Sequence, residues 1–422
     1  MPTARTLHAG IESPFAWLRL GAAAVLSTIG GVGTWSVPVM LPAVQVEFGV
    51  ARADASLPFT LAMVGFALGG VLMGRLSDRF GIVMPVLCGI VALSAGYIAA
   101  GFAPSLTSFA LVYVLIGLGT SATFGPLMAD TSQWFTRRRG IAVAIASSGN
   151  YAAGAVWPPV LHHFVATEGW RATHIGVGVF CALAMLPLLL LLRRRAPIQG
   201  DAAMEDSIAA ARRGPGLSAN TLQALLCVAG VACCVAMAMP QVHIVAYCGD
   251  LGYGVARGAE MLSLMLGFGI FSRIASGFIA DRIGGVATLL LGSTLQGVAL
   301  LLYLFFDGLA SLYVISALFG LFQGGIVAMY AIIIRDYFSP QEAGTRLGIV
   351  LMATLLGMAL GGWMSGALFD FTGSYRAAFV NGLIWNLLNM SIAVWLLMRT
   401  VGGPRTVEAR LAFARESGDR RR

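Results

Sequence analysis

Long apolar runs separated by short polar segments dominate the chain. Twelve such runs come close to, or exceed, the roughly 18 residues that a helix needs to cross the ~30 Å hydrocarbon layer of a bilayer. The predicted helices lie near residues 17–41, 56–74, 82–102, 106–133, 141–165, 172–192, 222–248, 259–279, 286–306, 310–334, 347–369 and 377–398. The pattern therefore predicts an all-α membrane protein with twelve transmembrane helices.

A polar segment divides these helices into two groups of six. It runs from Arg193 to Asn220 and is rich in arginine and acidic residues, which is typical of a solvated linker. We expect an N-terminal cytoplasmic tail, a six-helix bundle, a cytoplasmic linker, a second six-helix bundle and a basic cytoplasmic tail, over residues 1–16, 17–192, 193–220, 221–398 and 399–422. The apolar run that begins at Trp17 is too long for a cleaved signal peptide, so we expect it to remain as the first helix.

Composition and charge agree with a lipid environment. Hydrophobic residues make up 58% of the 422 positions and charged residues only 11%, whereas a soluble domain carries roughly a quarter charged residues. All 27 basic residues are arginines, and most lie in alternate loops. That distribution indicates a multi-pass protein of the inner membrane with both termini in the cytoplasm, and not a nucleic-acid-binding surface. The expected surroundings are the lipid bilayer, and we expect a monomer.

The absence of lysine excludes a phosphate-binding loop of the usual Gly-rich type with its lysine, and so excludes an ATP-driven mechanism within this chain. Neither metal-ligand spacing of His and Cys nor a Gly-x-Ser-x-Gly motif is present. We therefore expect no enzyme activity, no cofactor and no metal. The six cysteines lie in or beside apolar segments and are interpreted as small core residues: Cys88, Cys181, Cys227, Cys233, Cys234 and Cys248.

Sequence motifs repeat between the two halves. The residues Gly74, Asp78, Arg79 and Gly81 recur 203 residues later as Gly277, Asp281, Arg282 and Gly284. The pair Trp134-Phe135 recurs at the same offset as Tyr337-Phe338. An offset of six helices keeps both halves in the same orientation, so the pattern predicts two bundles related by a parallel pseudo-repeat, with a site at their interface near the middle of the membrane.

The segment 74–81, with the sequence GRLSDRFG, resembles the signature loop of the major facilitator superfamily, and the resemblance extends from the first helix to the last. The segments 134–140 (WFTRRRG) and 169–171 (GWR), and His243 with the residues that follow it, resemble the branch of monocarboxylate porters and oxalate-formate exchangers. This resemblance implies secondary or facilitative transport by alternating access, with a small organic anion such as a monocarboxylate as substrate. The alternatives are export of amphipathic drugs or other small molecules, a solute receptor that does not transport, and a scaffolding partner.

Arg273 is the only arginine in the interior of a predicted helix, since Arg19 lies at the very start of the first one. The resemblance places it where that branch has a substrate-binding arginine, and a guanidinium group matches a carboxylate with two hydrogen bonds. The alternative is an arginine about 6 Å from the helix end that extends to water. Proton-coupled members of the branch have an acid four residues earlier and a lysine in helix 1, where this chain has Gly269 and Val39. Uniport, exchange and a different coupling residue therefore remain open.

Further candidates fall into two groups. Polar and aromatic residues at middle depth are candidates for lining the substrate path, although each also suits ordinary packing: Trp35, Asn150, Tyr151, His243, Gln323 and Tyr330. The repeated loop residues Gly74, Asp78, Arg79, Gly81, Gly277, Asp281, Arg282 and Gly284, together with Asp130, are expected to act in gating. We expect Asp130 to pair with Arg75 or Arg79. Gly30, Gly31, Gly33, Gly117 and Gly119 are expected to permit close helix contact.

Overall fold

The computed structural model describes residues 12–135, 138–194, 217–338 and 340–401. Every regular element in these residues is a helix. The helices are α2 (Pro14–Gly30), α3 (Val32–Phe48), α4 (Arg52–Phe80), α5 (Val83–Gly101), α6 (Leu106–Ala122), α7 (Gly125–Trp134), α8 (Arg139–Leu191), α10 (Ala219–Asp250), α11 (Val255–Ile283), α12 (Gly285–Phe305), α13 (Leu309–Gln323), α14 (Ile326–Tyr337), α15 (Pro340–Thr372) and α16 (Tyr375–Val401). Most of the expected linker and of both expected tails lies outside the described residues.

Eleven helical stretches in the described part of the chain are long and apolar enough to cross a membrane. One of them, Ile141–Leu191, has 51 residues. Gly169 interrupts it with a non-helical backbone, at φ 80° and ψ 161°. The helices expected at 141–165 and 172–192 therefore lie within α8 on either side of this break in the helical backbone.

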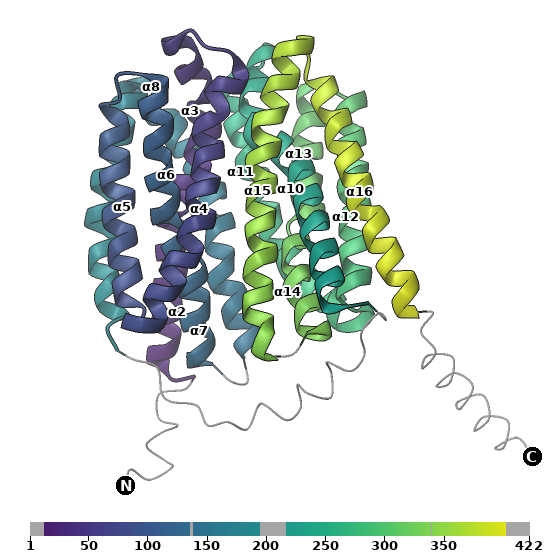
Figure 1. The fold of residues 1–422 in the computed structure, drawn as a ribbon. Helices are drawn as coiled ribbons and strands as arrows, with labels where there is room; N and C mark the ends of the chain where they lie inside the picture. The colour runs from purple at the N-terminus through teal and green to yellow at the C-terminus, as the bar shows by residue number, and fades with distance from the viewer. Residues whose placement is uncertain (1–11, 136–137, 195–216, 339, 402–422) are drawn as a thin grey trace, which may run out of the picture.

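The helices form two groups that lie side by side (Figure 1). Helices α2–α8 pack mainly on one another, as do α10–α16, and we call these groups the N-terminal set and the C-terminal set. The sets meet chiefly where α4 packs on α15, α8 on α11 and α3 on α10. We call the lower end in Figure 1, where α2 begins and α16 ends, the terminal end. We call the other end, where α4 begins, the opposite end.

Local sequence explains several helix ends. Side-chain oxygens of Ser13, Ser105 and Ser218 accept backbone N–H groups in the first turns of α2, α6 and α10, which satisfies donors that a helix start leaves unpaired. Gly81 and Gly284 directly follow the last residues of α4 and α11, with φ of 78° and 85°. A side chain at either position would be strained, so the repeated loop needs glycine there.

Glycines also allow helices to approach closely. A Cβ atom at Gly117 of α6 would lie 2.0 Å from the carbonyl oxygen of Ala62 on α4. The expectation of close contact is confirmed for all five glycines, because a Cβ would lie 2.6 Å or less from a neighbouring atom at Gly30, Gly31, Gly33, Gly117 and Gly119. Packing of this kind holds helices together where lipid removes the hydrophobic drive between them.

Two spans contain a break near their middle that matters for the site. Leu106–Trp134 is divided between α6 and α7, and Leu309–Tyr337 between α13 and α14. The second break falls at Gly324 and Gly325. A break frees backbone carbonyl groups from the helical ladder, so these groups are available to other donors.

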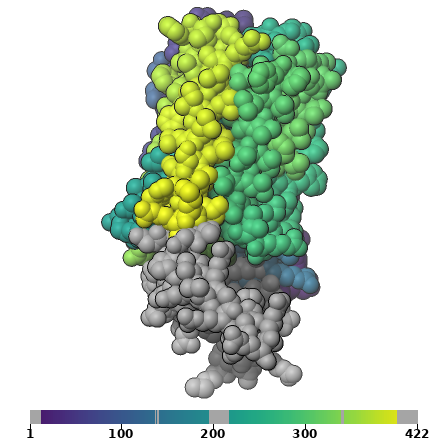
Figure 2. All heavy atoms as spheres, turned by 90° about the vertical axis from the view of Figure 1, so that its right-hand side faces the viewer, coloured from purple at the N-terminus to yellow at the C-terminus, as the bar shows by residue number. Residues whose placement is uncertain are grey.

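The outer surface is apolar. Ile384, Leu387, Leu388 and Val394 of α16 are exposed, and Figure 2 shows α16 as a column beside the green helices of the C-terminal set. Such a surface suits hydrocarbon and would promote association in water.

Several helices extend beyond their predicted ends. Helix α4 continues to Phe80 and α11 to Ile283, so Asp78 and Asp281 lie in the last helical turns and not in loops. The prediction ended each helix at the first polar residues after the apolar run. Backbone hydrogen bonding continues through those residues, because a helix end can extend out of the hydrocarbon layer.

Candidate functional site

A cavity of about 320 Å³ lies between the two sets. Residues of α3, α4 and α8 line it on one side, and residues of α10, α11 and α15 on the other. Its lining comprises Thr34, Trp35, Met63, Phe66, Ala67, Gly70, Val71, Ser121, Phe124, Gly125, Asn150, Tyr151, Cys234, Met237, Gln241, Arg273, Val327, Gly348, Leu351, Met352, Thr354, Leu355 and Met358. Arg273 is the one charged residue in this lining.

Arg273 lies deep within α11. It stands ten residues before the last residue of that helix, Ile283, which corresponds to ~15 Å along the axis. The expected distance of about 6 Å from Arg273 to the helix end is therefore too short, because α11 is longer than predicted. Among the described residues, no carboxylate oxygen lies within 4.0 Å of the guanidinium group.

The contacts of Arg273 bridge the two sets. Its Cζ lies 4.5 Å from the centre of the Tyr151 ring on α8. Its Nε donates to the carbonyl oxygen of Gly324, at the break between α13 and α14, and its Nη1 donates to the carbonyl oxygen of Ser147, each at 3.4 Å. These bonds are long, and the ring contact is a cation–π interaction. The guanidinium group is thus positioned but not neutralised.

The glycine four residues before Arg273 has a structural reason. A Cβ atom at Gly269 would lie 2.3 Å from Cε1 of Tyr151. The Tyr151 ring therefore occupies the space that a side chain at this position would need. The Tyr151 hydroxyl also donates to the carbonyl oxygen of Gly324 at 3.3 Å, so one aromatic side chain contacts both sides of the interface.

Of the seven residues expected along the substrate path, four line the cavity. These are Trp35, Asn150, Tyr151 and Arg273. The indole Nε1 of Trp35 donates to the carbonyl oxygen of Asn150 at 3.0 Å, which fixes the ring against α8.

The other three, His243, Gln323 and Tyr330, are fully buried and do not line the cavity. His243 hydrogen-bonds the Tyr375 hydroxyl at 3.0 Å through Nδ1 and the carbonyl oxygen of Gly362 at 2.8 Å through Nε2. Tyr330 donates to Oδ1 of Asn389 at 3.3 Å. The side-chain amide of Gln323 has no hydrogen-bond partner among the described residues.

Sequence reasoning missed several lining residues. Four methionines, Met63, Met237, Met352 and Met358, form much of the apolar wall, and Gln241 adds a polar group from α10. Apolar residues in a membrane helix look alike whether they face a cavity, a neighbouring helix or lipid. Gln241 could have been found, since an amide inside an apolar run is unusual.

A polar cluster joins the two sets at the opposite end. Arg52, at the start of α4, donates to both carboxylate oxygens of Asp250 on α10 at 3.0 and 3.1 Å and to the Tyr375 hydroxyl on α16 at 2.8 Å. Asp370 of α15 accepts the backbone N–H groups of Arg52 and Ala53 at 2.8 and 2.7 Å. A carboxylate from one set thus caps a helix of the other, where the helix dipole favours negative charge. We call Arg52, Asp250, Asp370 and Tyr375 the Arg52 cluster.

The expected gating residues lie at the terminal end. Asp78, Arg79, Asp281 and Arg282 are exposed. Within the described residues none of them is part of an ion pair. None of these four residues lines the central cavity.

The predicted pairing of Asp130 with Arg75 or Arg79 is wrong. Asp130 accepts hydrogen bonds from Arg19 of α2, with Nη2 to Oδ1 at 2.8 Å. Arg19 also lies over the ring of Trp134 at 4.8 Å. Trp134 therefore packs against the buried ion pair of Arg19 and Asp130 inside the N-terminal set.

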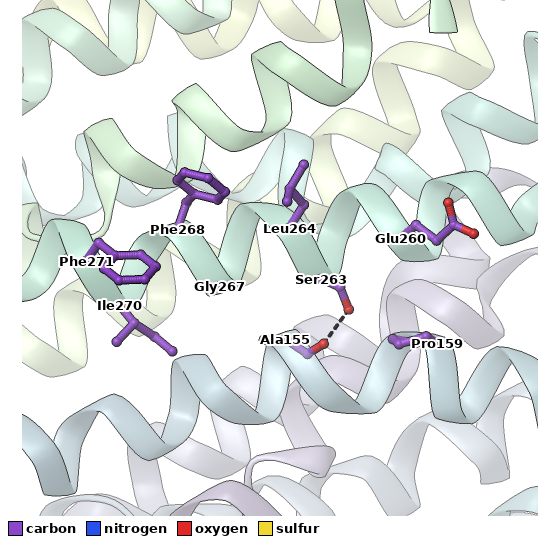
Figure 3. A pocket seen from close by; sticks show the side chains of 9 residues that line it. All are labelled: Ala155, Pro159, Glu260, Ser263, Leu264, Gly267, Phe268, Ile270 and Phe271. Atoms are coloured by element: carbon purple, nitrogen blue, oxygen red, sulfur yellow. Dashed lines mark hydrogen bonds between the residues drawn. The ribbon is translucent and has the colours of Figure 1, made fainter. Parts of the chain in front are cut away.

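A second hollow lies between α8 and α11 and has a volume of about 540 Å³. Figure 3 shows Ser263 of α11 turned toward Ala155 of α8, to whose carbonyl oxygen it donates. Phe268 and Phe271 in its lining are exposed on the apolar surface. Its one ionisable group, Glu260, is already bonded to Arg257 and Tyr313. The charged group of this hollow is thus already paired, so the central cavity is the better candidate.

Comparison with known proteins agrees with the fold. The family model of the Major Facilitator Superfamily matches residues 23–309 and 265–416. Monocarboxylate transporter 13 of Bos taurus is 30% identical over 348 residues, which cover 79% of each chain. The chain belongs to the major facilitator superfamily.

Other relatives of the transporter support the same branch and fold. Monocarboxylate transporter 11 of Mus musculus is 26% identical over 380 residues, 87% of this chain and 84% of that protein. A solved structure of a bacterial homolog of the human lysosomal transporter Spinster superposes with a TM-score of 0.65 at 17% identity, covering 92% of this chain and 96% of the other. The motif-based assignment to the monocarboxylate branch is confirmed. The protein is a multi-pass membrane transporter of a small molecule, and not an enzyme.

Proposed function

We propose that this transporter carries a small organic monoanion, such as a monocarboxylate, whose carboxylate pairs with Arg273. The observation that best supports an anionic substrate is the single charged group in the cavity lining, the guanidinium of Arg273. Arg273 is the one charged lining residue and has no carboxylate partner among the described residues. An unpaired cation at this depth is costly, and an anionic ligand would neutralise it with two hydrogen bonds. The names of the relatives point to the same substrate class.

The transport cycle is proposed to be alternating access by two six-helix bundles. The 51-residue stretch Ile141–Leu191 is about 76 Å of helix, far more than one crossing of ~30 Å needs. Gly169 is the point where we place a turn between two crossings, which gives twelve in total. The repeated motifs around Gly74 and Gly277, and the broken spans α6–α7 and α13–α14, support a parallel pseudo-repeat.

Orientation in the membrane is proposed from the arginines. If the terminal end faces the cytoplasm, 22 of the 27 arginines lie on that side, as the positive-inside rule requires. The proposed location is the inner membrane, with the protein acting as a monomer.

The conformation is then proposed to be open to the cytoplasm. The Arg52 cluster ties the sets together at the opposite end, while Asp78, Asp281 and their basic neighbours are exposed without ion pairs among the described residues. We propose that these terminal-end residues, with Gly74, Gly81, Asp130, Gly277 and Gly284, act when the cytoplasmic side closes.

Counterflow into proteoliposomes tests the anion assignment. We expect labelled phenylpyruvate to enter vesicles that are preloaded with the same unlabelled acid, because the parent protein exchanges it across the bilayer. Arg273→Ala should abolish this uptake. Arg273→Lys should lower affinity by about 10-fold or more, since it keeps the charge but loses one charge-assisted hydrogen bond worth ~1.5–3 kcal/mol.

Arg257→Ala is the matched control, because Arg257 lies on the same helix, is exposed and does not line the cavity. Each variant is checked for a monodisperse peak in detergent. Counterflow in Arg273→Ala at the level of the parent would contradict the proposal. Binding of the acid without counterflow would indicate a receptor.

A further inference from the structure

We propose that the site selects monoanions with a sizeable apolar body, and that carboxylates of two or three carbons are poor substrates. The carboxylate would lie at Arg273 and the body along the methionine wall, defined as Met63, Met237, Met352 and Met358. This inference rests on the proposed function, since it takes Arg273 as the anion partner, and it adds which anions the cavity accepts.

The size of the cavity is the first observation. A volume of about 320 Å³ corresponds to roughly ten groups of the size of a water molecule. A carboxylate uses about three of them and the whole of pyruvate about six, so pyruvate would leave about four of the ten to water. A ligand with six to eight further heavy atoms would fill the cavity.

The chemistry of the lining is the second observation. The four methionines come from three helices of both sets, and Trp35, Phe66, Leu351 and Leu355 extend the same apolar surface. The polar lining groups, Thr34, Ser121, Asn150, Gln241 and Thr354, are neutral. A ligand with one negative charge would therefore be neutralised by Arg273, while a second charge would meet no cation and would be desolvated at a cost.

Flexibility of the wall decides how shape is recognised. Methionine has three rotatable bonds and a polarisable sulfur, so it adapts to ligands of different outline. Trp35 is held by its bond to Asn150, and Phe66 packs edge-on against Phe124 with ring centres 6.0 Å apart. We therefore expect affinity to follow the apolar area of the ligand, with both straight-chain and aromatic bodies accepted.

A series of 2-oxo acids tests the proposal, because these acids share one head group and stay ionised at neutral pH. The measurement is competition with labelled phenylpyruvate in the counterflow assay, using pyruvate, 2-oxobutanoate, 2-oxohexanoate and 2-oxooctanoate. Affinity should rise about fourfold for each added methylene group, the equivalent of ~0.8 kcal/mol of buried apolar surface, until the cavity is full. Phenylpyruvate should bind far more tightly than pyruvate, and 2-oxoglutarate should compete poorly.

Variants of the wall provide the second measurement. Met352→Gln keeps the length of the side chain but adds a polar amide, so it should reduce the gain in affinity that each added methylene group of the 2-oxo acid brings. Met352→Leu is the matched control, since it keeps volume and polarity and should preserve the gain. Met352 is the partly exposed member of the wall and is therefore the least disruptive to change.

The outcomes separate this inference from the proposed function. If pyruvate competes as well as 2-oxooctanoate, or if 2-oxoglutarate competes best, the selection of apolar-bodied monoanions is wrong while Arg273-dependent anion transport stands. If no 2-oxo acid shows counterflow, or if Arg273→Ala leaves it unchanged, the proposed function fails and this inference fails with it.

Discussion

Replacing Arg52 by glutamine should favour opening of the opposite end. The guanidinium group donates two hydrogen bonds to Asp250 and one to Tyr375, across the contact between the two sets. The Asp250 side chain is 36% exposed, so water can replace its partner, and we take ~1 kcal/mol for this pair. The buried bond to Tyr375 adds ~1 kcal/mol. A total of ~2 kcal/mol corresponds to about a 30-fold change in the ratio of open to closed states.

Cysteine labelling measures this change. Ser56 of α4 is completely buried, one turn from Arg52, and Ser56→Cys changes one atom of the side chain. In a background without the six native cysteines, a membrane-impermeant maleimide added from the side of Arg52 should modify this cysteine slowly in the parent. The rate should rise by up to about 30-fold in Arg52→Gln, provided that opening is fast compared with labelling.

A matched control lies at the same end of the molecule. Arg171 pairs with Glu47 at 2.8 Å, but both residues belong to the N-terminal set. Arg171→Gln removes an arginine without loosening the contact between the sets, so labelling of Ser56→Cys should stay at the parent rate. Equal rates in Arg52→Gln and the parent, or an equal rise in Arg171→Gln, would refute the closing role of the Arg52 cluster.

Two further predictions follow from buried contacts. Arg19→Gln should destabilise the detergent-solubilised protein by ~3–5 kcal/mol, because it leaves the Asp130 carboxylate unpaired, whereas Arg19→Leu combined with Asp130→Leu should recover most of the loss in thermal unfolding. Gly269→Ala should cut phenylpyruvate counterflow severely, because its Cβ would lie 2.3 Å from the Tyr151 ring, while Gly267→Ala, whose Cβ would lie 3.8 Å from its nearest neighbour, should not. If Arg19→Gln left the stability unchanged, the importance of the Arg19–Asp130 ion pair would be contradicted. If Gly269→Ala left counterflow unchanged, the close packing of Tyr151 on Gly269 would be contradicted.

The sequence was sufficient for an all-helical membrane fold and for finding the charge of Arg273 in the central cavity. Apolar runs are long and easily recognised, and Arg273 was found because a charge inside such a run has few explanations. The cavity face of each helix could not be predicted. Trp35 and Tyr151 line the cavity whereas Tyr330 and His243 are buried among other helices, yet all four follow similar apolar patterns, since a membrane bundle is apolar on every side.

Partners across the chain were also beyond the sequence. Arg19 and Asp130 are 111 residues apart, and Arg52 and Asp250 are 198 apart. Counting arginines by loop placed Arg52 on one side of the membrane but gave no reason to pair it with any acid. The helix ends were misplaced by four to six residues where polar residues continue a helix, and this also hid how deep Arg273 lies in α11.

Glycine at position 269, in place of an acid, matters for what the site can do. A carboxylate there would neutralise Arg273 when the cavity is empty and would compete with an anionic substrate. The ring of Tyr151, which fills that space, stabilises the guanidinium group by a cation–π interaction of ~0.5–2 kcal/mol and adds no charge. The arginine is therefore held in place while its charge stays available. Because no acid among the described residues lines the cavity, a bound monoanion is the partner that would make the site neutral as the two sets close around it.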